Sequence, residues 1–81
     1  MHHVYILRSK KDQQRIYIGH ASDLDKRLRK HNESKTVYTK RYAPWYIETY
    51  IAFIDKKLAI QFEKYLKSGS GKTFLKRRLM R

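Results

Sequence analysis

The chain has 81 residues and a mass of 9.9 kDa, so we expect one small domain over residues 1–81 and exclude two. Apolar residues make up 41% of the chain, enough for a modest core, and the lack of cysteine excludes disulfides, Cys-ligated zinc, iron–sulfur clusters and thiol chemistry. Twenty Lys and Arg against seven Asp and Glu give a net charge of +13, which predicts an acidic partner such as a nucleic acid.

Targeting and membrane-spanning segments are not expected from this sequence. The N-terminal residues contain no apolar run long enough for a signal peptide, and no window approaches the roughly 20 apolar residues of a membrane span. We therefore expect a cytoplasmic protein that does not enter the membrane.

Two short runs of β-branched and aromatic residues, at positions 4–7 and 15–19, flank a polar stretch. This pattern predicts a strand, a loop and a returning strand. If the strands pair with Tyr5 opposite Tyr17, the two tyrosines share one face of the hairpin and the aliphatic residues share the other.

A helical period follows the second strand. Ser22 and Asp25 have the spacing of a capping box, and Leu24 and Leu28 begin an apolar stripe. These residues predict a helix from about residue 23 to residue 31 or 32.

The middle of the chain is expected to contain a loop and then the longest strand. Residues 32–44 are polar and basic and end at Pro44, which is typical of a loop. Residues 45–54 alternate with a period of two, which predicts a strand with Trp45, Ile47 and Phe53 on one face.

Two helices are expected after the longest strand. Residues 56–67 have helical spacing, and the sequence predicts that Leu58, Phe62, Tyr65 and Leu66 lie on one face. Gly69 is a plausible C-terminal stop for this helix, and a short basic helix is expected at residues 74–80. The element order is then ββαβαα, an α+β fold with a three-stranded antiparallel sheet flanked by helices.

Five side chains could together hydrolyse a phosphodiester, which requires a cation for the phosphoryl oxygens, a base for the water and help for the departing oxygen. Tyr5 and Tyr17 share a sheet face, and Arg27 and His31 project together from one helix at i, i+4. Glu63 can hold one Mg²⁺, which often takes only one or two protein carboxylates.

Each of these residues also has an ordinary structural interpretation. The tyrosines could be amphipathic strand residues, His31 a half-buried core histidine and Arg27 a surface cation. Glu63 could simply pair with Lys67 at i, i+4. The joint spacing of the five residues favours a site, because all of the separate interpretations would have to hold at once.

The sequence resembles the GIY-YIG nuclease superfamily, in particular its small single-domain bacterial branch, over nearly the whole chain. Tyr17-Ile18-Gly19 matches the second naming tripeptide, and Val4-Tyr5-Ile6 keeps the tyrosine of the first. An arginine eight residues after the second tripeptide falls at Arg27, and a glutamate on a later helix falls at Glu63.

The resemblance implies an endonuclease with Mg²⁺ or Mn²⁺ as cofactor. Tyr5 would act as the general base or position the attacking water, and Tyr17 would hold water or phosphate. Arg27 would stabilise the transition-state charge, Glu63 would bind the metal, and His31 would assist the base. A free tyrosine has a pKa of about 10, so we expect nearby cations or the metal to lower the pKa of Tyr5.

Cations elsewhere in the chain are expected to contact nucleic acid. The expected contact residues are Lys26, Arg29, Lys30, Lys35, Lys40, Arg41, Lys67, Lys72, Lys76, Arg77 and Arg78. The partner expected is DNA, with RNA left open, and branched or nicked substrates in repair or recombination are favoured because a small domain has little surface for reading sequence. The expected protein is a monomer or weak dimer. A binding module with little or no catalysis, and a nuclease subunit that needs a protein partner, remain alternatives.

Overall fold

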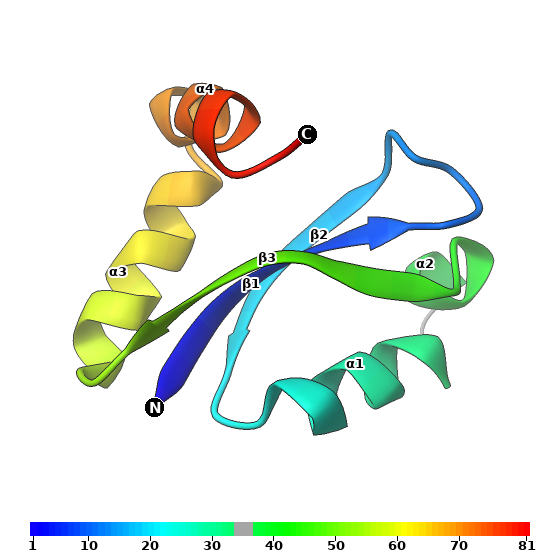
Figure 1. The fold of residues 1–81 in the computed structure, drawn as a ribbon, viewed down its shortest axis with the longest axis horizontal. Coiled ribbons are helices and arrows are strands. Elements are labelled where there is room, and N and C mark those ends of the chain that lie inside the picture. Colours follow the sequence, from blue (N-terminus) through cyan, green and yellow to red (C-terminus); the bar gives the residue numbers. More distant parts are fainter. Residues whose placement is uncertain (34–36) are drawn as a thin grey trace.

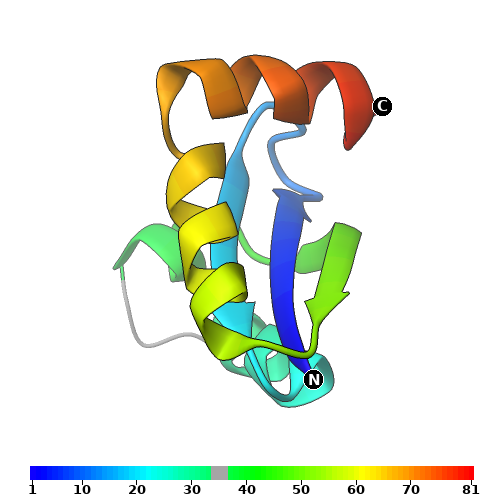
Figure 2. The ribbon, with the colours of Figure 1, turned by 90° about the vertical axis from the view of Figure 1, so that its left-hand side faces the viewer.

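The computed structural model describes residues 1–33 and 37–81 of the chain. Its elements are β1 (His2–Ser9), β2 (Ile16–Ala21), α1 (Leu24–Asn32), α2 (Val37–Arg41), β3 (Trp45–Phe53), α3 (Lys56–Leu66) and α4 (Gly69–Arg78). The sheet is antiparallel with the order β2-β1-β3. Helices α3 and α4 lie on one side of it, and α1 and α2 lie on the other (Figures 1 and 2). The expected α+β fold is confirmed.

The hairpin of β1 and β2 has a different register from the one predicted. Tyr5 pairs with Gly19, and Tyr17 pairs with Leu7, so the pairing of the two tyrosines is wrong by two residues. The Ser9 hydroxyl accepts the N–H groups of two loop residues and so holds the loop in the observed register. A shift of two residues preserves the face of every side chain, so the tyrosines still share one face.

The segment between α1 and β3 also differs from expectation. Helix α1 has the predicted extent, but its N-cap is Asp23 and not Ser22, since the Asp23 carboxylate accepts the N–H of Lys26 at 3.0 Å. Residues 37–41 form α2 where only a loop was predicted. The Trp45 indole N–H donates to the carbonyl of Thr39 at 2.9 Å, and a five-residue helix is too short to show a period in the sequence.

Strand β3 changes face along its length. Trp45 and Ile47 pack with Tyr5 on the α1 side, whereas Phe53 packs with Val4 on the α3 side. The prediction that Trp45, Ile47 and Phe53 share one face is therefore wrong. A register shift places Glu48 between the residues paired with Ile6 and Leu7, and an irregularity of one residue reverses the alternation that follows.

The connection between the two C-terminal helices is shorter than predicted. Gly69 does not end α3 but is the first residue of α4, which begins five residues earlier than expected and is capped by Ser68. Helix α3 packs through Ala59 and Leu66, whereas Leu58 and Tyr65 are 52% and 41% exposed. The predicted apolar stripe is thus rotated, because the small Ala59 side chain allows α3 to approach the sheet closely.

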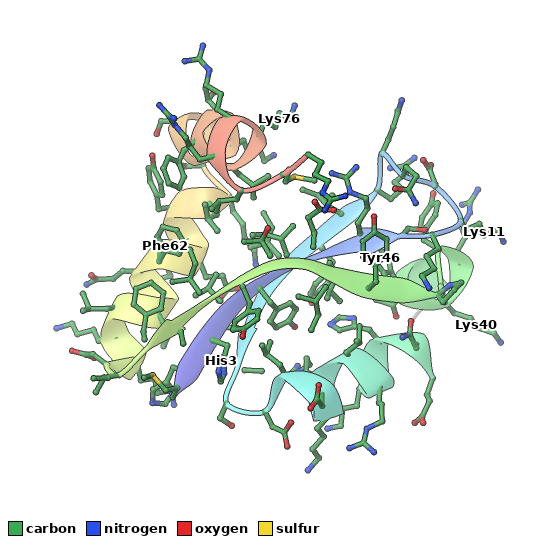
Figure 3. The ribbon with its side chains drawn as sticks, viewed as in Figure 1. His3, Lys11, Lys40, Tyr46, Phe62 and Lys76 are labelled. Atoms are coloured by element: carbon green, nitrogen blue, oxygen red, sulfur yellow. The ribbon has the colours of Figure 1, made fainter. Side chains whose placement is uncertain are left out.

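The sheet separates two hydrophobic clusters. On the α3 side, Val4 and Ile6 pack with residues of α3 and α4, and on the α1 side Tyr5, Leu7 and Trp45 pack with residues of α1. Figure 3 shows the side chains that fill both spaces. None of the described helices combines the length and apolar character that a membrane crossing requires.

Candidate active site

Tyr5 lies at the centre of β1 and is only 2% exposed. Its ring extends across the backbone of its pairing partner Gly19, where a Cβ atom would lie 2.5 Å from the Tyr5 hydroxyl oxygen and 3.2 Å from the Tyr17 ring. A glycine is therefore required at this position of β2. The sequence contained this residue within the second tripeptide, but its role became visible only from the observed register.

The Tyr5 hydroxyl meets a histidine from α1. Tyr5 Oη lies 3.2 Å from His31 Nε2, and Nε2 accepts the phenolic proton when the imidazole carries its own proton on Nδ1. The rings of Tyr17 and His31 are 4.4 Å apart between centroids, and the rings of Tyr5 and Tyr17 are stacked at 6.5 Å. The structure thus brings together three of the five predicted site residues.

Burial determines the protonation states of this cluster. It raises the pKa of Tyr5 to about 12, against the opposing positive charge of Arg27. Burial and the same Arg27 charge hold the pKa of His31 below its ordinary value of 6.5. The expectation that cations lower the pKa of Tyr5 is therefore wrong, because desolvation of the phenolate outweighs the guanidinium. Both groups are neutral near pH 7.

Arg27 is exposed on α1, one turn before His31. Together with Lys26 and Lys30 it lines a hollow of about 180 Å³, whose lining also includes Ala21 at the end of β2 and the acidic Asp23. The three cations outnumber the one carboxylate, so the hollow is suited to a phosphate group.

Glu63 lies on α3, and its carboxylate is 16% exposed. One oxygen accepts a hydrogen bond from His20 Nδ1 at 2.6 Å, and the other pairs with Lys67 Nζ at 2.8 Å. Burial alone would raise the pKa of Glu63, but the hydrogen bonds from Lys67 and His20 outweigh it and hold the pKa below the usual range. The negative charge of Glu63 also contributes to the raised pKa of Tyr5, so the two side chains are near each other.

The surroundings of Glu63 are compatible with a divalent metal. Among residues 1–33 and 37–81, no three His, Asp or Glu side chains are grouped as a metal site, so a metal would depend on Glu63 alone. Each carboxylate oxygen has two acceptor positions and uses one here. Lys67 is 53% exposed and free to move away, and Mg²⁺ commonly takes one carboxylate and fills its shell with water and phosphate oxygens.

His20 is a residue that the sequence did not single out. It follows Gly19 directly, on the opposite face of β2, and its bond to Glu63 joins residues 43 positions apart. Adjacency to the second tripeptide was the only available signal, because the contact depends on how α3 packs against β2.

The predicted nucleic-acid contacts divide between two ends of the molecule. Helices α1 and α4 lie far apart in both ribbon views (Figures 1 and 2). All of the described residues in the predicted set are exposed: Lys26, Arg29 and Lys30 on α1, Lys40 and Arg41 on α2, Lys67 after α3, and Lys72, Lys76, Arg77 and Arg78 on α4. Lys35 lies outside the described residues.

Comparison with known proteins gives one family. The sequence model of the GIY-YIG catalytic domain matches residues 1–78. No curated protein matches the chain. The matched span contains β1, β2, α1 and α3, and so every residue of the candidate site.

Proposed function

The chain belongs to the GIY-YIG family of nuclease catalytic domains, and from this we propose that it is a divalent-metal-dependent endonuclease that hydrolyses DNA. The proposal rests on the Tyr5–His31 hydrogen bond, whose tyrosine interacts electrostatically with Arg27 of the cationic hollow and with the carboxylate of Glu63. A proton acceptor, a phosphate-binding cation and a metal-binding carboxylate are the three groups that phosphodiester hydrolysis requires.

The acid–base work is assigned to His31 and Tyr5 acting together. Tyr5 with a pKa of about 12 is a poor base by itself at neutral pH. Neutral His31 can accept the phenolic proton through Nε2 while Tyr5 takes a proton from the attacking water. The water oxygen then forms a bond to phosphorus and the bond to the leaving oxygen breaks. The leaving oxygen takes up a proton from solvent, and His31 returns its extra proton to solvent.

The remaining residues would hold the substrate and its charge. Arg27, with Lys26 and Lys30, neutralises the negative charge that grows on the phosphoryl oxygens. Tyr17, whose ring contacts the rings of both Tyr5 and His31, would hold water or phosphate beside this pair. Glu63 would hold Mg²⁺ or Mn²⁺, which when bound polarises the phosphate and stabilises the leaving oxygen.

The substrates proposed are branched or nicked DNA structures in repair or recombination. The cationic surfaces on α1 and α4 lie at opposite ends of a molecule whose largest dimension is 30 Å (Figures 1 and 2). Phosphate contacts carry no sequence information, so two separate cationic surfaces favour substrates with two arms over recognition of one sequence.

The test is cleavage of labelled duplex, nicked, flap, fork and four-way-junction DNA with Mg²⁺, with Mn²⁺ and with a chelator. Glu63→Ala and Glu63→Gln should lower metal-dependent cleavage at least about a hundredfold. DNA affinity should stay the same or rise, because either change removes a negative charge. Glu33→Ala removes an exposed carboxylate outside the site and should leave cleavage unchanged.

Two results would contradict the proposal. Equal cleavage by wild type and Glu63→Ala would exclude the metal role of Glu63. Binding to every substrate with no cleavage by the wild type would favour a binding module, or a nuclease subunit that acts only with a protein partner.

A further inference from the structure

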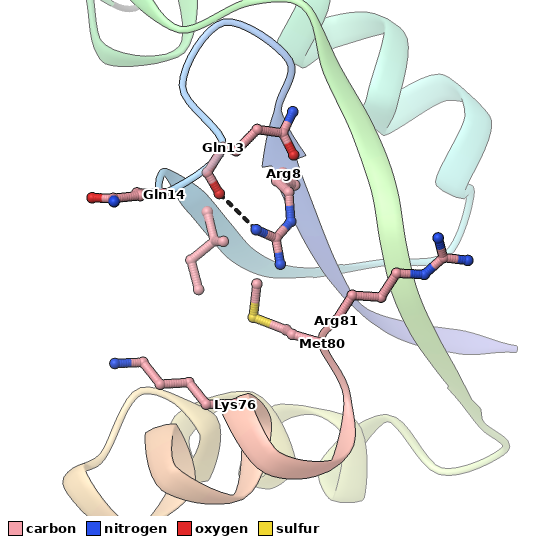
Figure 4. A pocket seen from close by; sticks show the side chains of 7 residues that line it. Arg8, Gln13, Gln14, Lys76, Met80 and Arg81 are labelled. Carbon is pink, nitrogen blue, oxygen red and sulfur yellow. Dashed lines mark hydrogen bonds between the residues drawn. The ribbon is translucent and has the colours of Figure 1, made fainter.

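A second hollow lies away from the candidate active site, between the β1–β2 loop and the C-terminal residues. It has a volume of about 400 Å³ and is lined by Arg8, Gln13, Gln14, Ile16, Lys76, Met80 and Arg81. Arg8 lies on the face of β1 opposite to Tyr5, because residues of odd and even number point to opposite sides of a strand. The hollow is thus on the α4 side of the sheet (Figure 4).

The guanidinium of Arg8 is held in one orientation. Its Nε donates to Glu48 Oε1 at 2.9 Å and its Nη1 donates to the Gln13 carbonyl at 2.6 Å. The side chains of Arg8 and Glu48 are 14% and 8% exposed. A guanidinium carries five N–H donors, so three remain, and among the described residues no acceptor takes them. Figure 4 shows this head group within the hollow.

A second cation lies at the opening of the same hollow. Lys76 projects from α4, is exposed, and forms no ion pair with the described residues. Because Glu48 balances the charge of Arg8, Lys76 and the third lining cation, Arg81, leave the hollow with an excess positive charge. A fixed guanidinium with free donors and a nearby ammonium are suited to a phosphate.

The rest of the lining is apolar and amide-bearing. Ile16 and Met80 belong to the edge of the core cluster on this side and form one wall. The Gln14 side chain stands at the rim (Figure 4). A volume of about 400 Å³ is in the range of small-ligand sites, and an apolar wall beside a phosphate site and an amide is suited to a nucleotide.

The position of the hollow relative to Glu63 suggests where the nucleotide comes from. Ile16 and His20 lie on the same face of β2, four residues apart, which is about 13 Å along a strand. His20 contacts Glu63. A nucleic-acid strand covers that distance in about four stacked nucleotides, so a strand that follows the β2 edge from the cleavage position can reach the hollow.

We propose that this hollow binds one unpaired nucleotide of the substrate strand, with its phosphate on Arg8 and Lys76 and its base or sugar against Ile16 and Met80. The inference rests on the proposed nuclease function, which identifies the nucleic-acid strand in the hollow as the substrate. It assigns the chain a preference for DNA with a single-stranded tail near the cleavage position.

The first experiment titrates isotopically labelled protein with deoxyadenosine monophosphate, and separately with inorganic phosphate and with deoxyadenosine, and follows backbone amide shifts by NMR. We expect saturable shifts at Gln13, Gln14, Ile16 and residues 76–81 with the nucleotide, and weaker binding of either part alone. Shifts of equal size at exposed lysines outside both hollows, such as Lys56 and Lys57, would overturn the proposal, because they would show unspecific attraction to anions.

Three variants locate the binding. Lys76→Gln removes the unpaired ammonium, and Arg8→Lys keeps a positive charge beside Glu48 but loses the guanidinium donors. Each should weaken nucleotide binding about tenfold. Lys57→Gln makes the same charge change at an exposed position of α3, outside the hollow and outside the predicted nucleic-acid contacts, and should change affinity less than about twofold. An equal loss in Lys57→Gln would overturn the assignment.

The second experiment compares affinities for a blunt duplex and for the same duplex with a short single-stranded tail, in chelator so that no cleavage occurs. Lys76→Gln and Arg8→Lys should reduce the preference for the tailed DNA, and Lys57→Gln should preserve it. Nucleotide binding without any effect on this preference would mean that the hollow takes free nucleotides, which overturns the substrate role. Both of these experiments measure binding. Failure of the nuclease proposal would therefore be seen separately, as an absence of cleavage in the cleavage assay.

Discussion

The Tyr5–His31 pair combines a phenol that is hard to ionise with an imidazole that is hard to protonate. Burial is the main cause of both shifts, and the charge of Arg27 favours the neutral form of His31. A neutral imidazole at the end of a buried hydrogen bond is the form that can accept a proton. The pair is therefore ready to act as a base near neutral pH without prior ionisation of Tyr5.

This protonation state predicts a pH dependence of cleavage. The rate should be constant near pH 7 and should fall as the pH drops through the pKa of His31, which lies below 6.5. The stability of the fold should fall in the same direction, because a pKa that is lower in the folded state makes the unfolded chain bind more protons. The measurement is kcat/KM and the free energy of unfolding between about pH 5 and pH 8.

The control for that profile is a pair of histidine variants. His31→Gln should lower the rate and remove this acidic limb, and His2→Gln, at the far end of β1, should retain it. An acidic limb that persists unchanged in His31→Gln would assign the titration to another group.

At the scale of residues, the candidate site residues could be predicted from the sequence, but the burial that determines their pKa values could not. Tyr5, Tyr17, Arg27, His31 and Glu63 were recognisable from residue type and spacing, and the structure brings the tyrosines and His31 into contact. The pKa of Tyr5 could not be predicted, because it depends on burial. The catalytic roles of these five residues stay predictions, which the cleavage assay tests.

At the scale of elements, the junction of α3 and α4 depends on one glycine. A Cβ atom at Gly71 would lie 1.6 Å from the backbone oxygen of Tyr65 and 2.8 Å from the Cα atom of Leu66. Backbone atoms cannot move aside as a side chain would, so any larger residue must separate the two helices. That would expose Leu66 and Leu75, which are now buried in the same cluster.

Gly71→Ala should therefore destabilise the fold by about 3 kcal/mol or more. Gly69→Ala is the matched control, because a Cβ atom there meets nothing within 4 Å and alanine favours a helix by up to about 1 kcal/mol. Urea unfolding of both variants measures the difference. Similar stabilities would show that the helices separate at little cost.

The elements also show what a local pattern can predict. Period-two alternation gave the correct faces of β1 and β2, and apolar spacing gave the extents of α1 and α3, whereas the predicted N-cap of α1 and the predicted buried face of α3 were wrong. The face change at Glu48 involves the bond to Arg8, which lies 40 residues away in the chain. The hairpin register and the helix at residues 37–41 involve bonds between side chains and nearby backbone groups, from Asp12 to Ser9 and from Trp45 to Thr39. The periodicity of apolar residues does not reveal such contacts of individual side chains.

At the scale of the whole molecule, charge is spread over both ends and does not form one basic surface. Three of the α1 cations line the hollow at Arg27, and the α4 cations lie at the opposite end (Figure 2). Phosphates bound at the first set would determine chemistry and affinity together, whereas phosphates bound at the second would add affinity without taking part in the chemistry. Removal of the α4 cations should therefore weaken binding to all DNA sequences equally.

Neutralising Lys76, Arg77 and Arg78 together tests this division. DNA affinity should fall, and the slope of log affinity against log salt concentration should flatten by about 0.9 for each DNA phosphate that the variant no longer neutralises. Cleavage at saturating DNA should be unchanged. An unaltered slope would mean that these side chains only keep the end of α4 solvated.

The position of Gly19 on an edge strand has a consequence for assembly. Among the described strands, β2 has β1 on one side and none on the other, so this edge of the sheet can pair with a strand of another chain. A fourth strand added there would lie beside Gly19 and His20 and hinder the approach to Tyr5 and Glu63. Strand addition at this edge would switch the site off, and only associations that leave the edge free are compatible with catalysis.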